Sequence, residues 1–110
     1  MIPPFGPTPF LMDIRELTEQ MHALVESKDW YAADSLRPQT ARNLAISLVL
    51  EASEVLEHFQ WGEALADKEA LAGELADVAL YLLQIASISD INLEQAILDK
   101  LDTNYSRSWE

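Results

Sequence analysis

Apolar residues recur at intervals of three and four in four segments of this 110-residue chain. That spacing lines one face of an α-helix, whereas the alternation of a strand persists nowhere. Each segment follows a residue type that caps helices, so we expect helices to begin after Asp13, Thr40, Asp67 and Asn92. The first three should end near Ser27, Gln60 and Ser89. The pattern predicts an all-α fold, a four-helix bundle with short connections.

Residues 1–12 precede the first predicted helix and are rich in proline. Proline fixes the backbone and removes a hydrogen-bond donor, so this segment cannot begin the helical body. We therefore expect an extended arm over 1–12 and one helical domain over 13–110. Gly62 is predicted to end the second helix in a left-handed conformation.

The charge balance restricts the partners of the chain. Seven Lys and Arg face nineteen Asp and Glu, which gives a net charge of −12. Nucleic-acid phosphates and anionic membranes both require basic patches, so we expect neither as a partner. There is no cysteine and there are only three glycines, which excludes thiol chemistry and a glycine-rich phosphate loop. The chain shows no signal-peptide pattern and no apolar run that approaches a membrane span, so we expect a cytoplasmic protein.

The second and third predicted helices are apolar on more than one face. Four short helices cannot cover that much apolar surface by themselves. We therefore expect the bundle to be completed by oligomerisation, as a homodimer or a homotetramer.

Two pairs of carboxylates stand at i, i+3 on these same helices, Glu51 with Glu54 and Glu74 with Asp77. Residues three apart share a helix face, so antiparallel packing would bring all four together. Such a cluster cannot stay charged and unpaired, and a divalent cation would relieve it. Oxygen ligands alone select Mg²⁺ or Mn²⁺. From the residues alone, a metal site and two solvated helix faces are equally good interpretations.

Two tryptophans, Trp30 and Trp61, fall in connections at helix ends rather than on apolar faces. Each could form the wall of a cleft and stack on a nucleobase, or could simply cover the end of the bundle. Tyr81 follows Asp77 by one helical turn and should point the same way, or it could equally be a core tyrosine with its hydroxyl at the rim. His22 and His58 are interpreted as surface or helix-end residues rather than metal ligands.

The fourth predicted helix carries Lys100, Asn104 and Arg107 at i, i+4, i+7. Such a face is ordinarily solvated. Opposite an acidic metal site it would balance the charge of a polyphosphate.

Several short motifs resemble those of one enzyme family, the MazG-like all-α nucleoside triphosphate pyrophosphohydrolases. The chain is most similar to the small dCTP pyrophosphatase branch of that family, over residues 13–107. The motifs are Arg42-Asn43-Leu44-Ala45, Glu51-x-x-Glu54, Phe59-Gln60-Trp61, Glu74-Leu75-Ala76-Asp77-Val78 and Tyr81.

The resemblance implies an enzyme that uses Mg²⁺ to cleave a deoxynucleoside triphosphate, dCTP by preference, into monophosphate and pyrophosphate. It implies Glu51, Glu54, Glu74 and Asp77 as metal ligands and catalytic residues. Among these four we predict, by preference, that Glu54 also acts as the general base. The resemblance also implies that subunits of a dimer or tetramer complete one another's sites. The implied substrate-binding residues are Trp30, Asn43, Trp61, Tyr81, Lys100, Asn104 and Arg107.

The sequence departs from the family between Trp30 and Asn43, where the connection is longer and carries Gln39-Thr40-Ala41. This is the segment in which the preferred base should be set. Two other function classes stay open. One is a non-enzymatic acidic helical module that docks a partner helix. The other is a di-metal oxidoreductase, although the required Glu-x-x-His pattern is missing because His58 follows Glu54 by four residues.

Overall fold

The protein is all-α in the computed structural model, which describes residues 12–65 and 67–108. Four helices follow one another as α1 (Ile14–Ser27), α2 (Ala41–Glu57), α3 (Lys68–Ile88) and α4 (Leu93–Tyr105). No strand occurs among these described residues, so the predicted fold class is confirmed. The predicted proline-rich arm falls almost entirely on residues 1–11, which lie outside the described part.

All four predicted helix starts are confirmed. In each case the side chain before the helix accepts a hydrogen bond from the backbone N–H three residues later. The distances are 2.8 Å at Asp13, 3.1 Å at Thr40, 3.0 Å at Asp67 and 3.0 Å at Asn92.

The predicted ends near Ser27 and Ser89 are confirmed, since α1 ends at Ser27 and α3 ends at Ile88 with Ser89 as its C-cap. The end of the second helix is not. Helix α2 stops at Glu57, three residues before the expected end. Gly62 has φ +150°, which is not the left-handed helical conformation predicted for it. That conformation is adopted instead by Asp29 (φ 57°) and Asp90 (φ 56°), which follow the last residues of α1 and α3.

These two aspartates close α1 and α3 in the same way. After α1, the N–H of Asp29 bonds the carbonyl of Glu26 at 3.0 Å and the N–H of Trp30 bonds the carbonyl of Val25 at 3.2 Å. This is a Schellman closure, which satisfies the free carbonyls at a helix end and turns the chain back over the last turn. At the end of α3 the N–H of Ile91 bonds the carbonyl of Ala86 at 2.8 Å.

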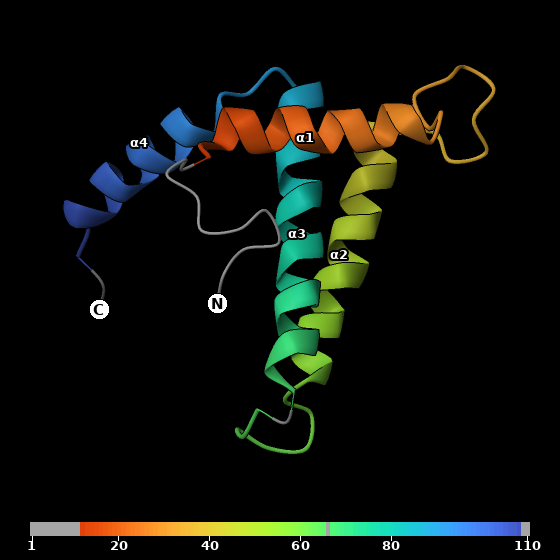
Figure 1. Cartoon of the computed structure of the whole chain (residues 1–110). Coiled ribbons are helices and arrows are strands. Elements are labelled where there is room, and N and C mark those ends of the chain that lie inside the picture. The colour runs from red at the N-terminus through yellow and green to blue at the C-terminus, as the bar shows by residue number, and fades with distance from the viewer. Residues whose placement is uncertain (1–11, 66, 109–110) are drawn as a thin grey trace.

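Helices α2 and α3 pack side by side and antiparallel, while α1 crosses one end of the pair and α4 leads away from the end of α3 (Figure 1). The core lies where α1 crosses α3. Its buried members are Met21, Val25 and Leu83, with Ile14, Trp30, Tyr31 and Leu93 packed against them. The pair of long helices therefore projects beyond the core.

Much of the apolar surface on the projecting pair is uncovered in a single chain. Val49, Leu50 and Leu56 of α2 are 66%, 60% and 69% exposed, and Leu75 of α3 is 51% exposed. The expected surplus of apolar surface is therefore present. The assembly that would cover it stays a prediction.

Helix α3 alone among the described helices is long and apolar enough to cross a membrane by length and average hydropathy. The sequence analysis expected no apolar run of that length. The same test is passed by core helices of soluble proteins, so one such helix is weak evidence. Glu74 and Asp77 lie within it, and carboxylates inside a membrane span are costly.

Candidate active site

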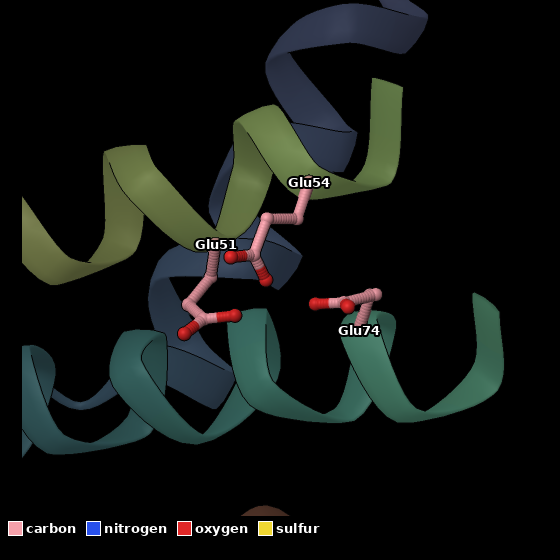
Figure 2. Close-up of side chains that lie close together, drawn as sticks. All are labelled: Glu51, Glu54 and Glu74. Atoms are coloured by element: carbon pink, nitrogen blue, oxygen red, sulfur yellow. The ribbon is translucent and has the colours of Figure 1, made fainter. Parts of the chain in front are cut away.

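Three of the four predicted carboxylates meet between the long helices. Glu51 and Glu54 extend from α2 toward Glu74 on α3, as Figure 2 shows. One oxygen from each of the three side chains lies within 4.8 Å of the others. The antiparallel packing of α2 and α3 therefore produces the convergence that the i, i+3 spacing predicts.

The cluster changes the acidity of its members. The pKa of Glu51 is raised from 4.5 to about 7, first by partial burial and then by the carboxyl and charge of Glu54, with smaller effects of Asp77 and Glu74. The pKa of Glu74 is also raised, chiefly because its carboxyl can share a proton with Glu54, and further by burial and neighbouring charge. Either a proton or a cation stabilises such a cluster.

One oxygen of the cluster argues for a cation. Glu74 Oε2 is enclosed and has no hydrogen-bond partner among the described residues. An enclosed acceptor without a donor costs free energy, which a bound cation would recover. Because every available ligand atom is a carboxylate oxygen, the donor set suits a hard divalent metal.

Asp77 lies one turn after Glu74 on α3 and outside the group of three. Its negative charge still contributes to the raised pKa of both Glu51 and Glu74, so it lies close to the cluster. Asp77 also lines a neighbouring pocket. It therefore connects the carboxylate cluster to that pocket.

The pocket has a volume of about 480 Å³ and is formed by α1, the connection after it, the start of α2 and the end of α3. Its walls include Trp30, Asn43, Asp77 and Tyr81, four of the residues predicted from the sequence. A volume of this size is in the range of small-molecule sites. The metal-ligand candidates and the base-binding candidates thus adjoin each other.

Local contacts explain the positions of two pocket residues, Trp30 and Asn43. Trp30 is turned toward the core by the left-handed Asp29, and the Arg37 guanidinium lies over its ring, 5.4 Å from the centroid. Asn43 is held to the connection because its side-chain nitrogen donates to the Pro38 carbonyl at 3.0 Å.

Comparison with known proteins places these features in context. No family model matches the chain. It is 38% identical to dCTP pyrophosphatase 1 of Mus musculus and 35% identical to that of Homo sapiens, in each case over 94% of this chain and 61% of the relative. The chain is therefore similar in sequence to mammalian dCTP pyrophosphatases over nearly its whole length. It spans about three-fifths of the length of these relatives.

A solved structure supports the same relationship. A pyrophosphatase from Archaeoglobus fulgidus superposes with a TM-score of 0.71 at 27% identity, covering 96% of this chain and all of that one. The resemblance to the dCTP pyrophosphatase branch is therefore confirmed.

The remaining predicted substrate residues do not line this pocket. Trp61 is 93% exposed and is absent from the pocket lining. No residue of α4 lines the pocket either, although Asn104 Oδ1 is enclosed without a hydrogen-bond partner among the described residues. The roles of Trp61, Lys100, Asn104 and Arg107 stay predictions.

Sequence reasoning missed several residues that do line the pocket, namely Arg37, Gln39, Ser47 and Gln84. Gln84 could have been found, since it follows Asp77 and Tyr81 at i, i+4, i+7 and so shares their helix face.

His22 is also placed differently from a freely exposed histidine. Its ring nitrogens lie 2.6 Å from Tyr31 Oη and 2.7 Å from Ser87 Oγ.

Proposed function

We propose that this protein is a Mg²⁺-dependent nucleoside triphosphate pyrophosphohydrolase that converts dCTP-like substrates into monophosphate and pyrophosphate, and so maintains the nucleotide pool. The observation that best supports this proposal is a carboxylate cluster beside a pocket of about 480 Å³ with aromatic walls. The similarity to proteins named dCTP pyrophosphatase 1 supports the substrate class.

Glu51, Glu54, Glu74 and Asp77 would hold the cation, Mg²⁺ by preference and Mn²⁺ as a substitute. When bound, the metal supplies charge stabilisation at the phosphate oxygens and lowers the pKa of water. The enclosed Glu74 oxygen favours this occupancy, and the raised pKa of Glu51 reflects the concentrated negative charge that a cation would offset.

Among the four carboxylates, Glu54 is proposed as the general base. Its carboxyl neighbours both Glu51 and Glu74 closely enough to share a proton with either. A proton taken from the attacking water could therefore be passed within the cluster. Cleavage between the α and β phosphorus would release pyrophosphate.

Trp30, Asn43 and Tyr81 would hold the nucleoside within the pocket. Arg37, the basic residue among the pocket walls, can offset phosphate charge that the net charge of −12 otherwise repels. The exposed Trp61 and the residues Lys100, Asn104 and Arg107 would act on the pocket of another subunit.

That arrangement requires a homodimer or a homotetramer of the 13–110 domain. The uncovered apolar surface of α2 and α3 supports it. We propose a cytoplasmic location and no nucleic-acid or membrane partner, because the strong negative charge opposes both.

The test is to incubate the protein with Mg²⁺ and each deoxynucleoside triphosphate and to identify the products by chromatography. We expect dCMP and pyrophosphate, with turnover abolished in Glu54→Gln. Glu19→Gln, an exposed change on α1, is the matched control and should remain active. Orthophosphate and dCDP as products would place cleavage at the γ position and refute the proposal.

A further inference from the structure

Gln84 is the one polar side chain that is buried among the described residues, with 4% of its surface exposed, and it lines the pocket. Its amide nitrogen lies 2.8 Å from Gln39 Oε1 and 3.2 Å from Tyr31 Oη. Buried polar side chains are nearly always hydrogen-bonded, and these two bonds hold the amide of Gln84 in place.

The orientation of Gln84 follows from its neighbours. Gln39 Nε2 lies 2.7 Å from the backbone carbonyl of Arg37, which can only accept, so Gln39 must present its nitrogen there. The oxygen of Gln39 therefore faces Gln84. Gln84 must in turn present its own nitrogen, because two oxygens would otherwise meet at 2.8 Å.

Tyr31 completes this fixed arrangement. Its hydroxyl accepts a hydrogen bond from Gln84 and lies 2.6 Å from His22 Nδ1. The two amide hydrogens of Gln84 are thus directed to Gln39 and Tyr31. A hydroxyl can donate or accept, so Tyr31 would tolerate either orientation of Gln84, and Gln39 alone prevents its rotation.

The oxygen of Gln84 remains as an acceptor at the pocket. It accepts no hydrogen bond within the described residues. Gln84 Oε1 is thus left without a donor among the described residues, on a side chain that lines the pocket.

We propose that Gln84 Oε1, fixed in orientation by Gln39, determines base specificity by accepting a hydrogen bond from the exocyclic amine of a cytosine ring. This rests on the proposed function, in which the pocket holds the base. Uracil and thymine carry an oxygen at that ring position and would place two acceptors against each other. A site that accepts a hydrogen bond from its substrate discriminates strongly against an analogue without that donor. This discrimination is far larger than the one that a single missing methylene group produces.

The experiment measures binding of dCMP and dUMP by calorimetry, which requires no hydrolysis. We expect the protein to bind dCMP at least about tenfold more tightly than dUMP. In Gln84→Met the ratio should fall to about one. Gln20→Met, an exposed change on α1, is the matched control and should keep the wild-type ratio.

A second pair of variants separates specificity from a loss of packing. Gln39→Met frees Gln84 to rotate, so dUMP should bind more tightly than it does to the wild type while dCMP binding changes little. Tyr31→Phe leaves Gln39 in place and should keep the preference for dCMP. A gain of dUMP affinity is not expected from damage to the fold.

Equal binding of dCMP and dUMP by the wild type, no detectable binding of either, or a ratio that survives Gln84→Met would overturn the assignment of Gln84. The proposed function fails on a different measurement, the absence of pyrophosphate among the products of any triphosphate.

Discussion

Glu54 has the largest influence on its neighbours of any residue in the cluster, because its carboxyl contributes to the raised pKa of both Glu51 and Glu74. A carboxyl whose pKa is higher in the folded state than in the unfolded state binds more protons when folded. Its stabilising contribution is complete below the unfolded pKa and is lost as pH rises through the folded value. For Glu51 that interval runs from 4.5 to about 7.

We therefore predict that the metal-free protein loses thermal stability between about pH 5 and pH 8. Glu54→Gln removes one charge and should flatten this dependence while raising the Tm near neutral pH. The measurement is the Tm by circular dichroism in the presence of a chelator. Glu19→Gln serves again as the control, and an unchanged slope in Glu54→Gln would contradict the electrostatic account of the cluster.

Added Mg²⁺ should compete with the proton that binds the Glu51 carboxyl. A ligand that binds only the folded state raises its stability, and carboxylates must be deprotonated to bind a metal. Because Glu51 titrates at about 7, we expect the Mg²⁺-induced rise in Tm to be larger near pH 8 than near pH 6. An equal shift at both values would mean that Mg²⁺ binds elsewhere, and no shift would favour a non-enzymatic helical module.

At the scale of the helices, the starts and two of the three predicted ends follow from the sequence, whereas the residues that close the helices could not be predicted. A side-chain cap such as Thr40 depends on one local hydrogen bond, which only a few residue types can make. The type of the residue is therefore enough to predict where the helix begins. The closing residues Asp29 and Asp90 are not glycines, and nothing in their type distinguishes them from capping or solvated aspartates. Gly62, the residue type expected there, lies beyond the true end of α2.

This difference can be tested at Asp90, whose left-handed φ of 56° strains any residue with a Cβ. The strain costs about 1–2 kcal/mol, whereas glycine costs about 0.5–1 kcal/mol in unfolded-chain entropy. Asp90→Gly should therefore raise the free energy of unfolding by about 0.5–1 kcal/mol in urea denaturation. Asp102→Gly, within α4 where φ is helical, should instead lower it slightly, by roughly 0.3 kcal/mol.

The candidate site shows a similar limit. The i, i+3 spacing predicted the meeting of Glu51, Glu54 and Glu74, because it depends only on two helices packing face to face. Arg37 and Gln39 could not be predicted, since their positions depend on the path of an irregular connection. Their contacts with Trp30 and Gln84 exist only once that connection has folded against α3.

For the whole molecule, the exposed apolar surface of α2 and α3 predicts an oligomer. Light scattering should give a mass at least twice the 12.4 kDa of one chain. Val49 is 66% exposed in the single chain, so Val49→Glu should barely affect its folding but should dissociate the assembly. Ala23→Glu, exposed on α1, is the matched control and should leave the mass unchanged.

Trp61 allows the assembly and the proposed active site to be tested together. It is 93% exposed and absent from the pocket of its own chain, so we expect it to reach the pocket of a partner. Base stacking is worth about 1–3 kcal/mol, so Trp61→Ala should weaken substrate affinity by roughly 5- to 150-fold. Glu54→Gln should abolish turnover while leaving Trp61 intact.

An equal mixture of these two variants, unfolded and refolded together, should regain activity that neither has alone. In a two-fold dimer with Trp61 supplied by the partner, half of the randomly paired dimers are mixed. Each mixed dimer contains one site with both Glu54 and Trp61, so about one site in four is intact. If Trp61 acted within its own chain, every site would keep one defect, and turnover at low substrate concentration would not exceed the average of the two variants measured separately.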